Sequence, residues 1–321
     1  MNIEGKKQFI FIVGSGRSGT TLLRNILAEH VDIGVCPELK FFDVILASRA
    51  KMIFLSWEKR TRMIVKRIIG KYKKSEDPLW SRFALTEEEI GAEIQGARSY
   101  REIFIILLRR FSTKPTARIQ VEKTPTNVFF LKEIRRYFPD AKIINMVRDG
   151  REVAASAKKR NWSENSDELA IWWKEAINTF KKWSKGKDNF IEIKYEDLVQ
   201  NPESVSSDIF RFIGVNTPEN LKDVISRVES FSSFYGQSKK GIYESHHFEE
   251  VFEKPIATRL EMLMCSELDL LGYNRYYKSS IIDNASLNLL RTIKIRLNLF
   301  SRRTGFFWIW ASLGHLVRNH K

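Results

Sequence analysis

Residues 9–27, FIFIVGSGRSGTTLLRNIL, constrain the fold of this chain more than any other segment. A short apolar run, typical of a strand buried on both faces, leads through a glycine-rich loop into a helical pattern. Gly14 and Gly19 have the spacing of a nucleoside-triphosphate loop, but Thr20 stands where the phosphate-binding lysine would be, and Arg17 places a cation inside the loop. Since backbone N–H groups at such a helix N-terminus point at one anion, we predict a phosphate site with altered specificity.

Short apolar runs alternate with helical patterns along the chain. After the first strand, we predict strands within 117–125, at 142–147 and within 189–198, each followed by a helix. This alternation predicts an α/β fold: a three-layer parallel sheet with flanking helices. We expect one domain at 1–278 with a basic helical insertion at about 41–108, followed by a basic, aromatic C-terminal helical extension at 279–321.

The charge balance favours an anionic partner. The 321 residues include 54 Lys and Arg against 39 Asp and Glu, a net charge of +15. This surplus does not choose among a nucleotide, a nucleic acid, an acidic glycan and a membrane. No segment has the form of a nucleic-acid-binding module, so a nucleic-acid partner is disfavoured.

The cysteine count and the apolar runs bear on metal binding and on compartment. Two cysteines, Cys36 and Cys265, cannot form a disulfide framework, and no Cys/His cluster suggests zinc. The N-terminal apolar run is too short for a secretory signal, and no run approaches the ~20 apolar residues of a membrane-spanning helix. We expect a cytoplasmic protein without a bound metal.

Charged residues stand at the ends of two later strands. Lys123 closes the strand in VEKTP. In VRDGREVAASAKKR, Arg148 stands at a strand exit, and Ser156 follows eight residues later on the next helix, so the two side chains can converge on an anion. By itself an RDGR turn is more often a solvated salt-bridge cluster, but it follows a buried strand as the first loop does.

The loop GSGRSGTTLL resembles the 5′-phosphosulfate loop of sulfotransferases that use 3′-phosphoadenosine 5′-phosphosulfate (PAPS), in the style of tyrosylprotein and bacterial sulfotransferases. The resemblance covers about residues 9–273 and is specific at this loop and at VRDGREVAAS. It implies a P-loop-like sulfotransferase fold, PAPS as donor, adenosine 3′,5′-bisphosphate (PAP) as product and no metal. The residues implied to hold the 5′-phosphosulfate are Gly16, Arg17, Ser18, Gly19, Thr20 and Thr21.

The same resemblance implies further donor contacts. Arg148 and Ser156 correspond to the family's 3′-phosphate site, and Lys123 to a lysine near the bridging sulfate oxygen. Tyr195, in YEDLVQNPE, lies near the nucleotide in this interpretation, although the residue itself favours the role of a packed core tyrosine. Lys239 and Lys240, in SKKG, resemble a late basic loop that closes on the 3′-phosphate, with a solvated turn as the alternative.

Sulfuryl transfer requires a base near the acceptor hydroxyl and cations near the leaving oxygen. We assign Arg17 and Lys123 as the cations. Glu38 lies 21 residues after Arg17, the distance of the catalytic glutamate in tyrosylprotein sulfotransferases, although CPEL holds only one acid where those enzymes have GEE. We predict Glu38 as the base, with a pKa raised by burial. His246 and His247 are the alternative bases.

The sequence does not identify the acceptor. The basic insertion favours an acidic glycan, lipid or peptide acceptor, although a solvated charged face explains it as well. The tryptophans of NW and IWWKEAI are expected to pack in the core. The aromatic tail fits peripheral membrane contact or a packed helix pair. The alternative functions are a P-loop kinase or nucleotide-binding protein and a non-enzymatic nucleic-acid-binding protein.

Overall fold

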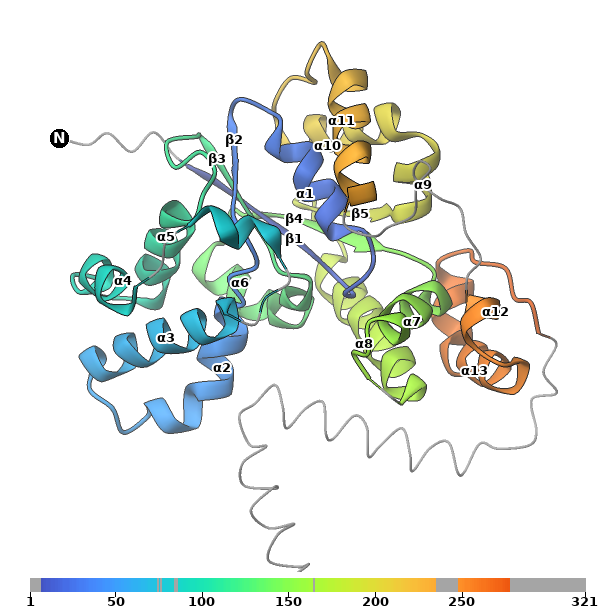
Figure 1. Cartoon of the computed structure of the whole chain (residues 1–321), viewed down its shortest axis with the longest axis horizontal. Helices are drawn as coiled ribbons and strands as arrows, with labels where there is room; N and C mark the ends of the chain where they lie inside the picture. The colour runs from blue at the N-terminus through green and yellow to red at the C-terminus, as the bar shows by residue number, and fades with distance from the viewer. Residues whose placement is uncertain are drawn as a thin grey trace, which may run out of the picture.

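A five-stranded, all-parallel sheet forms the centre of the molecule (Figure 1). The computed structural model describes residues 7–277 except 74, 76, 84, 85, 164 and 235–247. The strand order is β2-β3-β1-β4-β5, with β1 in the middle. The strands are β1 (Gln8–Gly14), β2 (Ile33–Val35), β3 (Ile119–Lys123), β4 (Lys142–Val147) and β5 (Phe190–Lys194). The predicted α/β parallel sheet is confirmed, but β2 was missed because it has only three residues.

Both faces of β1 are buried, as its uninterrupted apolar sequence predicted. Ile10 and Ile12 point to one face and Phe11 and Val13 to the other, and all four side chains are fully buried. Phe11 pairs with a β3 position on one side and with a β4 position on the other. The strand therefore anchors two hydrophobic cores, one on each side of the sheet.

The face that bears Ile10 and Ile12 is covered by four helices. The apolar sides of these helices meet isoleucines and valines of all five strands. Figure 1 shows them gathered above the sheet. They are α1 (Thr20–Ala28), α9 (Tyr195–Gln200), α10 (Pro202–Ile213) and α11 (Leu221–Phe234).

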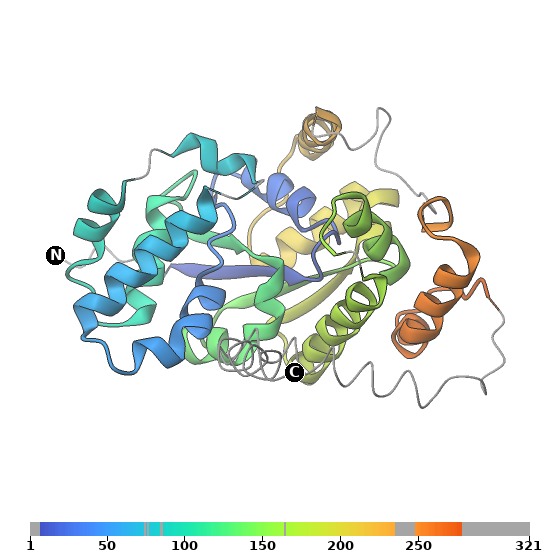
Figure 2. The ribbon, with the colours of Figure 1, turned by 60° about the horizontal axis from the view of Figure 1, so that its bottom comes forward.

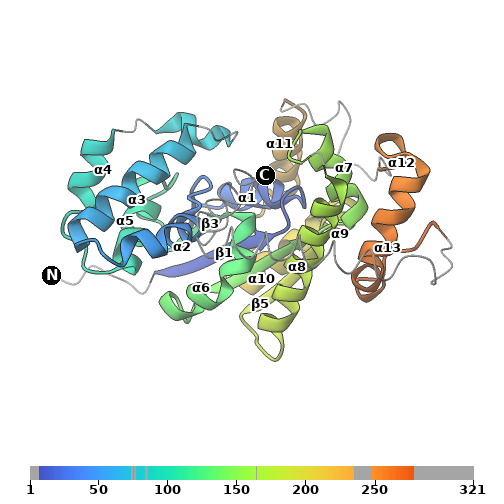
Figure 3. The same cartoon turned by 90° about the horizontal axis from the view of Figure 1, so that it is seen from below.

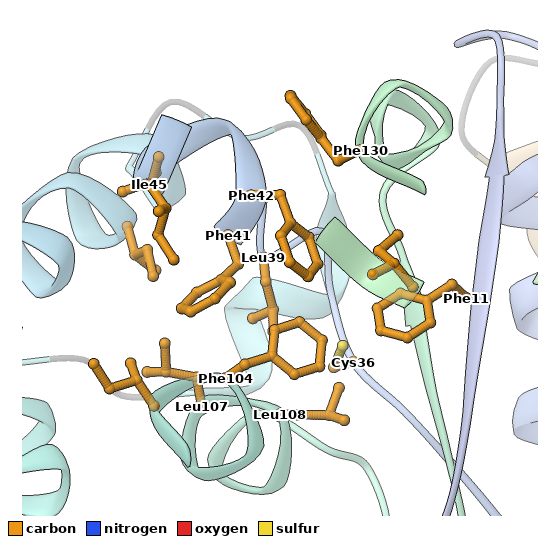
Figure 4. Packing of buried hydrophobic residues seen from close by; sticks show 14 of the residues in the cluster. Phe11, Cys36, Leu39, Phe41, Phe42, Ile45, Phe104, Leu107, Leu108 and Phe130 are labelled. Carbon is orange, nitrogen blue, oxygen red and sulfur yellow. The ribbon is translucent and has the colours of Figure 1, made fainter. Parts of the chain in front are cut away.

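The predicted insertion packs over the opposite face. Rings of Phe11, Phe42 and Phe104 meet between the sheet, α2 and α5 (Figure 4), with centroids of Phe11 and Phe104 5.6 Å apart. The insertion contains α2 (Phe41–Met52), α3 (Trp57–Tyr72), the 3-10 helix η1 (Pro78–Arg82), α4 (Glu87–Ile94) and α5 (Tyr100–Arg110). Its predicted helical character is confirmed.

The single helix expected after β3 is instead divided. A 3-10 helix, η2 (Pro125–Phe130), precedes α6 (Leu131–Tyr137). Pro125 begins η2, where its missing N–H costs no hydrogen bond. The 3-10 helix therefore begins two residues after Lys123, the last residue of β3.

A third cluster joins the helices that follow β4 to the last described part of the chain. Figures 2 and 3 show the last two of these helices at the end of the molecule opposite the insertion, and the two that follow β4 between them and the sheet. They are α7 (Gly150–Lys159), α8 (Ser166–Ser184), α12 (Phe248–Val251) and α13 (Lys254–Leu270). Among the described helices, none is both long and apolar enough to cross a bilayer. The predicted extension at 279–321 lies outside the described residues.

Candidate functional site

The glycine loop between β1 and α1 has an unusual backbone. Gly14 has φ 145°, and a Cβ there would lie 2.4 Å from the carbonyl oxygen of Met146 on β4. Gly19 has φ 84°, and a Cβ there would lie 2.4 Å from the Tyr195 ring. Arg17 is also left-handed, with φ 70°, although it has a side chain. The loop is therefore tightly fitted between β4 and α9.

The N-terminus of α1 has the features of an anion-binding site. Gly19 is its N-cap residue and supplies no side-chain hydrogen bond to the first turn. Ser18 is fully buried, and within the described residues its Oγ has no hydrogen-bond partner. A buried hydroxyl and the first amides of a helix, placed together at a strand end, fit a phosphate group.

Arg17 is oriented by two residues from the α7 region. Its Nε donates to Ser156 Oγ at 3.0 Å, and its guanidinium carbon lies 5.7 Å from the centre of the Trp162 ring. A Cβ on Gly16 would meet that same ring at 2.6 Å. Trp162 is 52% exposed, so the prediction that it packs in the core was wrong. It instead covers the loop, whereas Trp173 is fully buried as expected.

Arg148 reaches the same loop from β4. Its Nη1 donates to the carbonyl oxygen of Arg17 at 3.5 Å, and its guanidinium carbon stands 4.7 Å from the centre of the Tyr195 ring. Its Nη2 lies 3.3 Å from a carboxylate oxygen of Glu152. Burial raises the pKa of Tyr195, so this ring stays neutral. The structure therefore brings Arg17, Arg148, Ser156 and Tyr195 together.

Lys123 approaches the loop from the other side, at the end of β3. The residue is 1% exposed. Its Nζ donates to Thr21 Oγ1 at 3.2 Å and lies 2.5 Å from Glu38 Oε1. A single buried ammonium thus links the first turn of α1 to the predicted base.

Glu38 is ionised more readily than the sequence suggested. Burial acts to raise its pKa, but the positive charges of Lys123 and Lys40 and the hydrogen bond from Lys123 outweigh burial, so the pKa is lowered. Lys40 Nζ stands 3.6 Å from Glu38 Oε2. The expectation of a raised pKa was therefore wrong, because it took account of desolvation and not of two nearby cations.

A buried ion pair supports this group and was not predicted. Asp77 Oδ2 accepts from Arg24 Nη1 at 2.6 Å and from the Glu38 backbone N–H at 3.1 Å, and lies 3.8 Å from Lys123 Nζ. Despite burial, the charges of Lys123 and Arg24 lower the pKa of Asp77 to about 2. The DP break after the basic run signalled only a turn, and no local pattern connects Asp77 with Arg24.

A second buried carboxyl lies next to Lys123 in sequence but serves another purpose. Glu122 is 1% exposed, and burial raises its pKa to about 8. Asn127 Nδ2 donates to it at 2.6 Å, and the Leu39 N–H at 3.3 Å. Enclosed and largely protonated at neutral pH, it fixes the segment that carries Glu38 and has no opening toward a substrate.

The other predicted groups are placed as follows. Lys239, Lys240, His246 and His247 lie outside the described residues. His30 is buried, with Nε2 3.1 Å from the carbonyl oxygen of Asn216, which is a structural role. In the part of the chain that the structure describes, no group of His, Cys, Asp and Glu side chains is suited to a metal ion.

The fold and loop define an α/β protein with a P-loop-like anion site, and comparisons with known proteins specify its class. The model of the sulfotransferase family matches residues 9–219. Protein-tyrosine sulfotransferase 1 of Danio rerio is 26% identical over 216 residues, covering 64% of this chain and 53% of that protein. The Drosophila melanogaster protein-tyrosine sulfotransferase is 27% identical over 214 residues, covering 64% of this chain and 38% of that protein.

Solved structures agree on the fold. The sulfotransferase domain from the curacin biosynthetic pathway has a TM-score of 0.54 at 18% identity, covering 84% of this chain and 99% of that domain. The corresponding domain of the Synechococcus PCC 7002 olefin synthase has a TM-score of 0.53 at 19% identity, covering 85% and 98%. The chain belongs to the sulfotransferase family, and it spans about half the length of the first curated relatives that it matches.

Proposed function

We propose that this protein transfers a sulfuryl group from PAPS to a hydroxyl or amine acceptor. The observation that carries the proposal is the Lys123–Glu38 contact beside the glycine loop, which joins a buried cation and a carboxylate at the anion site. Membership of the sulfotransferase family supports the same chemistry.

The residues around the loop fit the donor. Ser18 Oγ, the first amides of α1 and the Thr20 and Thr21 hydroxyls would hold its 5′-phosphate, because they form an uncapped helix start with a buried hydroxyl in need of a partner. Arg148 and Ser156 would hold the 3′-phosphate. Tyr195, against Gly19 and under Arg148, would support that end of the site. When bound, PAPS supplies the sulfuryl group.

The chain's own side chains then divide the work of transfer. Lys123 and Arg17 would neutralise charge that develops on the leaving phosphate oxygen. Glu38 would accept the proton of the acceptor hydroxyl, since its lowered pKa keeps it ionised near neutral pH. Glu122 is a poor alternative base, because it is enclosed and holds its proton up to about pH 8.

The acceptor would enter from the side of the insertion. There Asp43 Oδ2 accepts from Thr126 Oγ1 at 2.9 Å, in a setting where burial raises the pKa of Asp43. The positive charges of Lys71 and Lys40 act to lower the pKa of Asp43, so both cations lie near this carboxyl. We infer that the acceptor is polar and acidic, and that it belongs to a glycan, a lipid or a peptide.

Calorimetry with PAP and with ATP plus Mg²⁺ tests the donor assignment. We expect PAP to bind more tightly than ATP, and Arg148→Ala to weaken PAP binding at least tenfold by removing a half-buried cationic phosphate partner. The matched control is Arg211→Ala, because Arg211 is 78% exposed and pairs with Asp208 on the surface. Preferential binding of ATP, or equal effects of the two variants, would refute the proposal.

A further inference from the structure

The turn between α2 and α3 displays two adjacent apolar side chains. Phe54 is 90% exposed and Ile53 62% exposed, whereas Met52, just before them, is 3% exposed. Single exposed apolar residues are ordinary on protein surfaces, but an adjacent pair at the tip of a helical hairpin indicates a contact surface. Figures 1 and 3 place α2 and α3 at the end of the molecule opposite α12 and α13.

The turn is held in place by hydrogen bonds. Arg60 Nε donates to the Leu55 carbonyl oxygen at 2.9 Å, and its Nη2 donates to the Ile53 carbonyl oxygen at 3.2 Å. Ser56 caps α3 by accepting from the Lys59 N–H. These polar contacts therefore hold the turn in a conformation that exposes the apolar side chains of Ile53 and Phe54 to water.

Positive charge surrounds this tip. Residues 41–73 hold nine Lys and Arg but only two acids, Asp43 and Glu58. Asp43 bonds to Thr126 beside the catalytic groups, and Glu58 pairs with Arg62 at 2.6 Å. On α3, the exposed positions Lys59, Arg62 and Lys66 lie within an arc of about 60° at 100° per residue, and exposed Lys73, just after the helix, falls on the same arc. This face is a basic stripe that starts next to the apolar tip.

The combination selects one kind of partner. A free acidic peptide or glycan would match the charge but would leave the Phe54 ring in water. A second copy of this chain would meet the stripe with like charge. An anionic lipid surface satisfies both features, because head groups attract the basic residues and the acyl boundary takes up the apolar ones.

We propose that the α2–α3 turn is a membrane-docking site, which inserts Ile53 and Phe54 into an anionic bilayer surface while Lys59, Arg62 and Lys66 contact lipid head groups. The inference does not depend on sulfuryl transfer. It also places the acceptor side of the protein near the membrane, because the insertion that carries the turn also covers the region around Glu38.

Cosedimentation of the full chain with lipid vesicles tests the site. We expect binding to vesicles of phosphatidylcholine with phosphatidylserine and little binding to phosphatidylcholine alone. The double variant Ile53→Ser/Phe54→Ser should lower the partition coefficient at least about tenfold, and Lys59→Glu/Lys66→Glu by a similar factor. Val31→Ser is the matched control: Val31 is 80% exposed in the turn before β2, so its loss should leave binding unchanged.

Circular dichroism and thermal melting of each variant establish that the fold is intact, as expected for substitutions in solvent. Absence of vesicle binding by the wild-type chain would overturn the proposal. So would a tip variant that binds like wild type, which would place any attachment elsewhere in the chain. If the tip variant instead loses binding to a glutamate-rich peptide while still binding vesicles, the surface serves a protein partner and the membrane assignment fails.

Discussion

Lys123 Nζ lies 2.5 Å from Glu38 Oε1, although the two residues are 85 positions apart. Lys123 ends β3, and Glu38 follows β2, the strand that pairs with β3. Parallel pairing therefore delivers a cation and a carboxylate to the same edge of the sheet. Because the contact joins the proposed leaving-group cation to the proposed base, removing the Lys123 charge will raise the pKa of Glu38.

Glu38→Gln removes the proposed base while preserving its size. We expect the rate of transfer in a single turnover to fall by a factor of about 10²–10⁴, with PAP affinity changed little. Glu29→Gln is the control, because Glu29 is 39% exposed in a surface pair with Arg227. Transfer by Glu38→Gln at a rate near that of the wild type would assign the base elsewhere.

Asp77→Asn tests the buried ion pair with Arg24. Side chains of both residues are at most 5% exposed, so the uncompensated guanidinium should lower the free energy of unfolding by about 3–5 kcal/mol. The pKa of Asp77 is lowered to about 2, so its contribution is present above the ordinary value of 3.8 and is lost as pH falls toward 2. The difference between variant and wild type should therefore shrink over that range, by about 2.5 kcal/mol.

Denaturant unfolding at several pH values measures this effect. Asp208→Asn, which breaks the exposed pair with Arg211, should change stability by about 0–1 kcal/mol at most. In folded Asp77→Asn we also expect kcat to fall by a larger factor than PAP affinity, since Asp77 bonds the Glu38 backbone directly and reaches α1 only through Arg24 and Lys123. Equal losses in the two variants would show that the buried pair has no special role.

Gly19→Ala tests the tight fit of the loop. A left-handed Ala costs roughly 1–2 kcal/mol, and its Cβ would displace the Tyr195 ring that lies beneath Arg148. We expect PAP affinity to fall at least tenfold in calorimetry. Gly91→Ala, on α4 with nothing within 4 Å of a new Cβ, should keep PAP affinity and stabilise the fold by about 0.5–1 kcal/mol. Unchanged PAP binding by Gly19→Ala would contradict a loop that holds the ligand.

Glu122 makes stability depend on pH. Its pKa is raised to about 8 in the folded state from an ordinary 4.5, so the folded chain keeps a proton that the unfolded chain releases. Stability should therefore fall as pH rises from about 5 to 8, by at most about 1.4 kcal/mol per pH unit. Glu122→Gln should remove this slope in thermal melts across that range. An unchanged slope would show that Glu122 is ionised in the folded protein.

The alternation of apolar runs and amphipathic helices was enough to predict the parallel sheet, because strands buried on both faces leave a strong apolar pattern. β2 escaped prediction because Ile33–Val35 is too short to show a period. The division of the helix after β3 also escaped, since Pro125 is compatible with the first turn of either kind of helix.

The site was predictable where its residues follow strands. Lys123 ends β3, Arg148 directly follows β4 and Arg17 lies in the loop after β1, and the carboxyl ends of parallel strands meet at one edge. Asp77 was not predictable, because it is brought in by tertiary packing of the insertion against Arg24. Trp162 was misassigned for the same reason: its sequence does not reveal that it covers Arg17 from outside.

The insertion leaves and rejoins the sheet at one place. Val35, at the end of β2, pairs with Val121 of β3, and the Thr113 N–H donates to the Val35 carbonyl oxygen at 2.9 Å. The two ends of the insertion therefore lie side by side next to the sheet. If the function proposed above holds, exchanging residues 41–108 for a segment that keeps a carboxylate at the position of Asp77 should change the acceptor side while leaving Arg17 and Arg148 in place, so one continuous segment can be replaced without removing either arginine.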